Sequence, residues 1–122
     1  MKRLILVIIM MISTLGIYSF TANALDAKKT CYASYYHNKF NGKKTASGEV
    51  FNNSKLTAAH RTIPFGTNVK ITNLNNGKEV IVKINDRGPF HSARGLDISK
   101  AAFEEIEDAN HGTIPVQYEI VD

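Results

Sequence analysis

Runs of β-branched residues dominate the pattern of hydrophobic positions along the chain. Residues 80–84 (Val-Ile-Val-Lys-Ile) are typical of a well-buried strand. Residues 68–74 alternate polar and apolar side chains around Val69 and Ile71, which predicts a second strand with one buried face. Asn76-Gly77 between the two runs favours a hairpin turn, because both residues tolerate positive φ. The two segments are therefore expected to pair.

Two further strands are expected near the ends of the chain. Residues 30–36 combine aromatic and small side chains, and residues 116–121 alternate apolar and polar positions. A Gly-Thr step leads into a strand at both 66–71 and 112–118, and this weak internal echo suggests a small pseudo-symmetric barrel.

One helix of two to three turns is predicted after residues 96–99, with Asp97 or Ser99 as its N-cap. Its apolar stripe would consist of Ala102, Phe103 and Ile106. Residues 56–60 are predicted to be short helical or irregular. The chain is therefore expected to be mainly β, with one domain.

The N-terminus has the features of a secretory signal peptide. Lys2 and Arg3 precede an apolar run, and residues 21–24 (Thr-Ala-Asn-Ala) match a signal-peptidase site, which predicts a signal peptide over 1–24. The alternative, a retained membrane anchor, is disfavoured because the apolar core is short. Residues 25–29 are then expected to form a polar tail and residues 30–122 the domain, located in the periplasm or outside the cell.

Charge and cysteine content narrow the function classes. The chain has 15 basic and 11 acidic residues, and loss of Lys2 and Arg3 would lower its formal charge from +4 to +2. Nucleic-acid binding is therefore poorly supported, whereas a mildly cationic domain could still favour binding to an anionic polymer of the envelope. Cys31 is the single cysteine, so no intramolecular disulfide can form. It lacks a lipobox, and no residues have metal-ligand spacing, so neither a lipid anchor nor a metal or other cofactor is expected.

Asp86 and Arg87 are the first candidates for chemistry. The strand at 80–84 runs directly into residues 85–89 (Asn-Asp-Arg-Gly-Pro), a turn-forming cluster that is expected to end it. A carboxylate and a guanidinium would then lie at the rim of a sheet. A partly protonated carboxylate in a cleft can donate its proton to the leaving oxygen of a glycosidic bond. A structural turn is the alternative, and residues 85–89 alone favour it.

Glu49 and His60 also lie beside turns, where side chains reach the surface. His60 could orient a carboxylate or bind sugar hydroxyls. The alternatives are a solvated turn residue at Glu49 and a packing residue at His60. Tyr35, Tyr36 and Phe90 could stack on sugars, although aromatic residues in a small barrel are more often core.

Several ordered sequence blocks resemble the RlpA-like (rare lipoprotein A) double-psi β-barrel domains of the bacterial envelope. The blocks are Ala-Ser-Tyr-Tyr at 33–36, Gly-Lys-Lys-Thr-Ala-Ser-Gly-Glu at 42–49, residues 56–67, Val-Lys-Ile-Thr-Asn-Leu at 69–74, Asn-Asp-Arg-Gly-Pro-Phe at 85–90 and Leu-Asp-Ile-Ser at 96–99. The resemblance implies a six-stranded double-psi β-barrel with one or two short helices. One departure is Cys31, which replaces the glycine usual in the family.

The resemblance also implies a lytic transglycosylase that cleaves peptidoglycan glycan strands, preferably those lacking stem peptides, and leaves 1,6-anhydro ends. Carried over by position, Asp86 matches the acid/base and Glu49 the second acidic residue of the site. The expected substrate-binding residues are His60, Arg87, Tyr36, Ser34 and Asp97. A monomer is expected. Two alternatives stay open: a non-catalytic, expansin-like glycan-binding module, and a structural envelope domain that binds other proteins.

Overall fold

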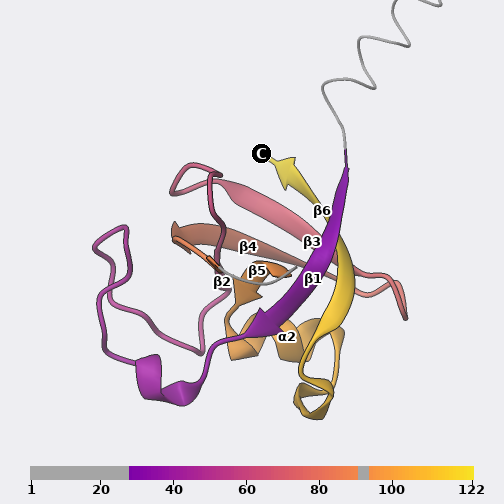
Figure 1. Cartoon of the computed structure of the whole chain (residues 1–122), viewed down its shortest axis with the longest axis horizontal. Coiled ribbons are helices and arrows are strands. Elements are labelled where there is room, and N and C mark those ends of the chain that lie inside the picture. The colour runs from indigo at the N-terminus through magenta and orange to yellow at the C-terminus, as the bar shows by residue number, and fades with distance from the viewer. Residues whose placement is uncertain (1–27, 91–93) are drawn as a thin grey trace, which may run out of the picture.

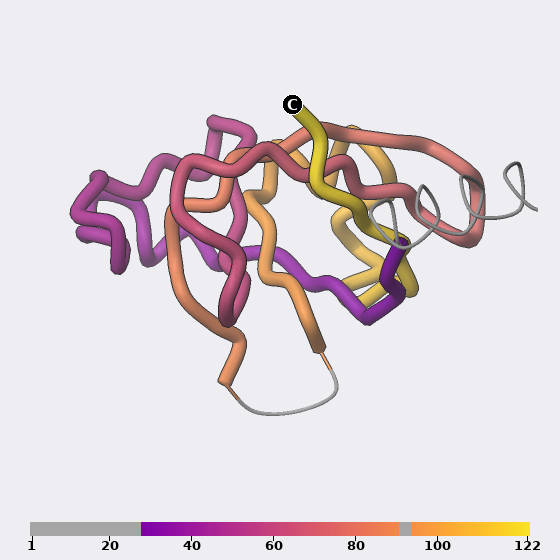
Figure 2. The backbone as a smooth tube through the Cα atoms, turned by 90° about the horizontal axis from the view of Figure 1, so that it is seen from above, coloured from indigo at the N-terminus to yellow at the C-terminus, as the bar shows by residue number. Residues whose placement is uncertain are grey.

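The chain folds into a closed barrel of six strands, seen from the side in Figure 1 and from above in Figure 2. The computed structural model describes residues 28–90 and 94–122, so the predicted signal peptide lies outside the described residues. The strand order around the barrel is β1-β5-β2-β4-β3-β6. The strands are β1 (Lys29–Tyr35), β2 (Thr57–Ala59), β3 (Asn68–Asn73), β4 (Glu79–Asp86), β5 (Arg94–Ile98) and β6 (Ile114–Val121).

The barrel mixes parallel and antiparallel pairing. Strands β1 and β5 are parallel, as are β2 and β4, whereas the other four pairs are antiparallel. Strands β3 and β6, which follow the two Gly-Thr segments, pair along six positions. The predicted six-stranded barrel is therefore confirmed, and each of the six described strands pairs with a neighbour on both sides.

The hairpin predicted from Asn76-Gly77 is present between β3 and β4. Ile71 pairs with Val80, and Val69 pairs with Val82. Gly77 has a φ of +77°, which only glycine adopts without strain. Alternate residues of both strands point into the barrel, where they form much of its core: Val69, Ile71, Val80, Val82 and Ile84.

The predicted helix is α2 (Lys100–Ile106), and it lies below the barrel in Figure 1. Ser99, rather than Asp97, is its N-cap: the Ser99 hydroxyl accepts a hydrogen bond from the Ala102 amide. The expected stripe of Ala102, Phe103 and Ile106 is fully buried, as predicted. Two 3-10 turns, η1 (Asn38–Phe40) and η2 (Ala109–His111), complete the elements. Within the described part of the chain, no helix has the length and apolar character needed to cross a membrane.

Residues 56–60 were wrongly predicted as helical or irregular, because residues 57–59 form strand β2. The segment Thr-Ala-Ala carries little strand propensity. Its position between two neighbours decides its conformation, since β2 pairs in parallel with β4 and antiparallel with β5. Its three residues are all buried, so the small side chains at Ala58 and Ala59 fit a crowded part of the barrel.

Four other boundaries differ from the prediction. Strand β4 continues through Asn85 and Asp86, because Asp86 pairs with Ala59 after a register shift that leaves Asn85 as the extra residue in β4. Residues 94–98, expected only to lead into the helix, form strand β5 between β1 and β2. Strand β6 begins at Ile114, two residues earlier than expected, and Lys29 already belongs to β1. In each case the extra residues are held by pairing with a strand that is distant in sequence.

Cys31 packs against β5 as the half-buried thiol that was predicted. A methyl group added at Gly95 would lie 2.7 Å from the Cys31 Cβ and 2.8 Å from its Sγ. Position 95 therefore has no room for a side chain as long as Cys31 is present. Burial raises the pKa of the Cys31 thiol to about 11, so the thiol stays protonated at neutral pH.

Candidate active site

Two carboxylates lie at the ends of neighbouring strands, on either side of Ala59. Ala59 in β2 pairs with Asp86 in β4 and with Asp97 in β5, and Asp97 also pairs with Ser34 in β1. Three predicted site residues, Ser34, Asp86 and Asp97, thus lie with Ala59 at one end of the barrel, each on a different strand. Rigid strand ends can hold reactive groups at a fixed separation while a part of each stays accessible.

The Asp86 carboxylate is held by three donors. Its Oδ1 accepts hydrogen bonds from the backbone amides of Ala46 and Arg87, both at 2.9 Å. Its Oδ2 accepts one from the Tyr36 hydroxyl at 2.6 Å. Because two backbone donors occupy Oδ1, a proton on this carboxyl group is best accommodated at Oδ2. Oδ2 is therefore the oxygen available for proton transfer.

Tyr36 is itself held in place by aromatic neighbours. Its ring stacks on Phe51, with centroids 4.5 Å apart and planes at 26°, and meets the edge of the Phe40 ring at 5.9 Å. Burial, followed by the hydrogen bond to Asp86, raises the pKa of Tyr36 far above its usual value, so its hydroxyl remains a donor. Tyr36 was expected to bind substrate, and the structure places its hydroxyl on Asp86.

The loop that carries Ala46 docks on the end of β4. A bridge between Lys44 and Val50 closes the loop, and Gly48 turns it with a φ of +90°. The Ser47 amide donates to the Asn85 carbonyl at 3.2 Å, which places Ala46 beside the Asp86 carboxylate. Sequence reasoning missed Ala46 and Phe51, because a backbone amide and a buried ring leave no chemical signature in a sequence.

Glu49 lies in the same loop but faces a lysine. Its Oε2 accepts a hydrogen bond from Lys83 Nζ in β4 at 2.8 Å, and its Oε1 lies 3.5 Å from the Ser47 hydroxyl. The hydrogen bond from Lys83 lowers the pKa of Glu49, so Glu49 is ionised at neutral pH. In the part of the chain that the structure describes, no hydrogen bond joins Glu49 to Asp86. Glu49 can therefore supply negative charge near the site, but it is poorly suited to donate a proton.

His60 contacts Asp86 through its backbone only. The His60 amide donates to the Asp86 carbonyl at 3.2 Å, as part of the pairing between β2 and β4. Its ring Nδ1 accepts hydrogen bonds from the Thr62 and Ile63 amides, which leaves Nε2 protonated and 3.3 Å from the Tyr118 hydroxyl. Burial, with the nearby charges of Lys29, Arg61 and Arg87, lowers the pKa of His60. The structure thus places this neutral ring against Tyr118.

Arg87 stabilises the turn that follows His60. Its Nη1 donates to the carbonyls of His60 and Ile63, at 3.3 and 2.8 Å. Its guanidinium lies 3.9 Å from the centroid of the Phe65 ring, a cation–π contact. Since Phe65 is exposed, this side of the site presents an aromatic ring beside a cation.

Asp97 and Ser34 form a second polar cluster with Arg94. The Ser34 hydroxyl donates to Asp97 Oδ1 at 2.7 Å, and Arg94 Nη1 contacts both the Ser34 hydroxyl and, at 3.2 Å, Asp97 Oδ1. Asp97 is therefore bonded within the barrel, to β1 and to its own strand β5, and does not cap the helix. Arg94 was missed, although its spacing of three residues from Asp97 was visible in the sequence. Among the described residues, no group of three or more His, Cys, Asp and Glu side chains is placed to hold a metal ion.

Comparison with known proteins identifies relatives of this domain. A family model described as "Lytic transglycolase" matches residues 28–118. The "Probable endolytic peptidoglycan transglycosylase RlpA" of Treponema pallidum is 58% identical over 85 residues, which are 70% of this chain and 27% of that protein. The "Endolytic peptidoglycan transglycosylase RlpA" of Campylobacter jejuni is 49% identical over 89 residues, 73% of this chain and 32% of that protein. The chain thus spans about a third of the length of these curated relatives.

Solved structures show the same fold at low sequence identity. The Streptomyces papain inhibitor superposes with a TM-score of 0.65 at 23% identity, covering 78% of this chain and 94% of the inhibitor. A mutant expansin of Clavibacter michiganensis in complex with cellohexaose gives 0.63 at 21% identity, covering 78% of this chain and 50% of the expansin. With the family match over residues 28–118, the predicted resemblance is confirmed: the chain belongs to the lytic transglycolase family of RlpA-like double-psi β-barrels.

Proposed function

We propose that this domain is a lytic transglycosylase that cleaves peptidoglycan glycan strands, with Asp86 as its acid/base. One observation carries the proposal: Asp86 ends a barrel strand with Oδ1 bound to two backbone amides and Oδ2 turned to the Tyr36 hydroxyl. A single carboxyl group held in this way can transfer a proton and take one back, which is the minimum that the reaction requires.

The reaction has two proton transfers. Protonated Asp86 gives its proton to the glycosidic oxygen between N-acetylmuramic acid and N-acetylglucosamine, and the bond from that oxygen to C1 breaks. The 6-hydroxyl of the muramic acid then attacks C1, and its proton passes to Asp86. The products are a free hydroxyl and a 1,6-anhydro ring; no water is consumed, and Asp86 returns to its protonated form. The Tyr36 hydroxyl stabilises the carboxylate between the two steps.

The other residues have supporting roles in this proposal. Ionised Glu49 would stabilise positive charge that develops at C1, from the loop that also positions Asp86. Asp97 and Ser34 would contact sugar hydroxyls from β5 and β1, while Arg87 and His60 shape the adjoining wall. The family match and the printed names of the relatives support this activity.

The substrate also suggests where the protein acts. Peptidoglycan lies outside the cytoplasm, so we place the protein in the periplasm or outside the cell, in agreement with the signal peptide predicted over residues 1–24. It would act as a monomer without a cofactor. Strands lacking stem peptides would be the preferred substrate.

A non-catalytic glycan-binding module is the second candidate. It is favoured by the pairing of both neighbouring carboxylates, Glu49 with Lys83 and Asp97 with Arg94. With these two groups neutralised, the same end of the barrel could bind sugar without cleaving it. Binding to intact sacculi without release of product, and binding that survives Asp86→Asn, would support this candidate.

Mass analysis of the products released from purified glycan strands tests both candidates. We expect anhydromuramic ends from the wild type and a loss of about 10²- to 10⁴-fold with Asp86→Asn. Asp108→Asn is the matched control, because Asp108 caps η2 at the other end of the barrel and asparagine is an equally good cap. Normal activity of Asp86→Asn would contradict the acid/base assignment, and products that have gained water would contradict the lytic reaction.

A further inference from the structure

A recess lies beside Tyr36, the residue whose hydroxyl donates to Asp86. It has a volume of about 350 Å³, at the small end of the range for ligand sites. Its lining includes Tyr36 and His37 from the segment after β1, Lys39 and Phe40 from η1, and the Arg94–Asp97 pair from β5. The recess therefore adjoins the candidate active site through Tyr36 and is walled by aromatic rings and cations.

The charges around the recess are unequal. Asp97 is neutralised by Arg94 and also accepts a hydrogen bond from Ser34. Lys39 has no acidic partner among the described residues: its Nζ lies 5.3 Å from the centroid of the Phe40 ring. Lys43 Nζ lies 5.6 Å from the centroid of the same ring, also without a carboxylate among the described residues. The rim at Phe40 thus carries two positive charges that form no ion pair with a described carboxylate.

The helical side of the domain does not share this excess. Helix α2 and the segment after it are acidic, with Glu104, Glu105, Glu107 and Asp108. The acidic cluster lies in and after helix α2, whereas Lys39 lies in η1 and Lys43 in the segment that follows η1. An anionic ligand would therefore be directed to the η1 segment and repelled from the helix.

From this geometry we infer that the recess binds a carboxylate-bearing unit of the glycan, with Lys39 as the counter-ion and Phe40 against the apolar face of the sugar. The inference rests on the proposed function and names a binding position for its substrate. Two sources of the carboxylate share this chemistry: the acid group of the sugar itself in peptide-free strands, and the acid groups of the attached peptides. A neutral sugar would gain only the aromatic contact.

Equilibrium binding to glycan strands tests the inference without depending on turnover. The protein would carry Asp86→Asn, so that no strand is cleaved, alone or combined with Lys39→Gln or Lys39→Glu. We expect Lys39→Gln to weaken binding to peptide-free strands by about 2- to 5-fold and Lys39→Glu by about 10-fold, with both effects reduced at high ionic strength. Lys39→Arg should restore binding. Lys78→Glu is the matched control, because Lys78 is an exposed lysine in the distant β3–β4 turn.

Chemical masking of the carboxylates provides the decisive comparison. On strands whose carboxylates have been converted to amides, the Lys39 variants should bind as the unsubstituted protein does. An effect on peptide-free strands assigns the carboxylate to the sugar, and an effect confined to peptide-bearing strands assigns it to the peptide. Two results would overturn the inference. One is binding by the Lys39→Glu protein that equals that of Asp86→Asn alone on both peptide-free and peptide-bearing strands. The other is a loss of binding on amidated strands as large as the loss on untreated strands. Failure of the proposed function is read separately, as the absence of anhydro products from the wild type.

Discussion

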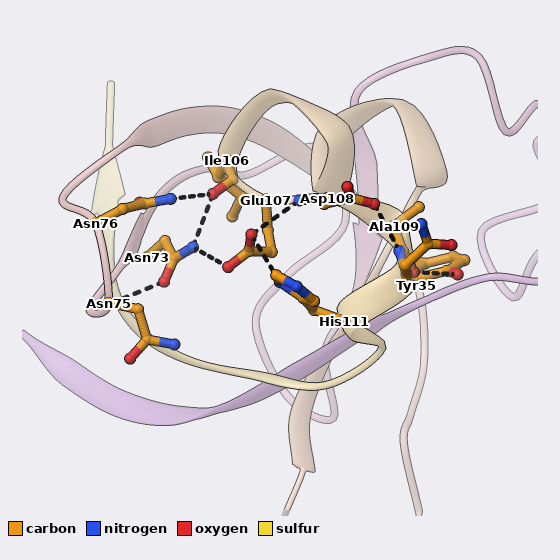
Figure 3. A network of polar contacts seen from close by, with 10 residues as sticks. Tyr35, Asn73, Asn75, Asn76, Ile106, Glu107, Asp108, Ala109 and His111 are labelled. Atoms are coloured by element: carbon orange, nitrogen blue, oxygen red, sulfur yellow. Dashed lines mark hydrogen bonds and ion pairs between the residues drawn. The ribbon is translucent and has the colours of Figure 1, made fainter.

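Two polar networks occupy opposite ends of strand β4, and they differ in how completely they are closed. One surrounds Asp86 at the last residue of the strand. The other lies at the first residues, where the β3–β4 turn meets the end of helix α2 (Figure 3). In Figure 2 the loop that reaches Asp86 and the β3–β4 turn lie on opposite sides of the barrel.

The network at the helix end satisfies nearly every group within the protein. The side-chain amides of Asn73 and Asn76 both donate to the Ile106 carbonyl, at 2.7 and 2.9 Å, and Asn73 also reaches Glu107. The last carbonyls of a helix have no hydrogen-bond donor within the helix, and here the β3–β4 turn supplies donors to one of them. Asn73 is fully buried. This network therefore joins the helix to the barrel through a buried centre, although its exposed member Asn76 lines a surface recess.

The network at Asp86 is organised by the same kinds of contact but stays half-open. Three donors fix the carboxylate, yet Asp86 and Tyr36 are only partly buried and the recess adjoins them. Consecutive residues of the chain serve the two networks: Tyr35 donates to the Ala109 carbonyl at 2.7 Å and packs on Phe103, whereas Tyr36 donates to Asp86. The comparison indicates that a polar network serves stability where its central group is buried, as at Asn73, and can serve chemistry where its central group remains partly accessible, as at Asp86.

Tyr36→Phe should separate the two networks most strongly. The phenyl ring retains the packing on Phe51, but Asp86 Oδ2 loses its donor, so we expect kcat to fall about 10- to 100-fold with little change in stability. Tyr35→Phe removes one hydroxyl from the closed network and should cost about 1 kcal/mol of stability with kcat unchanged. Steady-state kinetics and urea unfolding of both variants give the measurement. A kcat of Tyr36→Phe equal to that of Tyr35→Phe would mean that Tyr36 does not position Asp86.

Asn73→Ala should have the opposite profile. It removes one donor to the Ile106 carbonyl in a buried site, so we expect the free energy of unfolding to fall by about 1 to 3 kcal/mol. Activity per folded molecule, measured well below the melting temperature, should be unchanged. Asn110→Ala is the control, because Asn110 is exposed and only its backbone takes part in the contacts of η2. A loss of activity without a loss of stability would contradict the division between the networks.

Lys83→Gln should give the smallest effect, and one that depends on pH. Lys83 lowers the pKa of Glu49, so its loss lets that pKa rise and Glu49 becomes protonated at a higher pH. If catalysis requires ionised Glu49, the acid limb of the pH–rate profile moves to higher pH. The rate should then fall about 3-fold near pH 5 and stay unchanged near pH 7. His111→Gln, which removes the partner of Glu107 in the other network, should leave the profile unchanged. An unchanged profile for Lys83→Gln would mean that the charge on Glu49 is not used.

Local patterns were sufficient for a large part of the fold. Alternation in β3 and the apolar run in β4, with Gly77 between them, identified the hairpin, because side chains alternate between the two faces of a strand. The stripe of Ala102, Phe103 and Ile106 identified the helix for the corresponding helical reason. Strand β2 was missed because its Thr-Ala-Ala sequence has no such pattern, and only its pairing with β4 and β5 makes it a strand.

The candidate site shows the same division. The sequence by itself determined that a carboxylate, Asp86, follows a buried strand, and the ordered blocks from 33 to 99 determined the family. The tertiary structure alone decided that Tyr36, 50 residues away, donates to Asp86 and that Lys83 pairs with Glu49. It also turned the His60 ring toward Tyr118. The physical reason is that strand type depends on neighbours along the chain, whereas the direction and partner of a polar side chain depend on which strands the closed barrel places side by side.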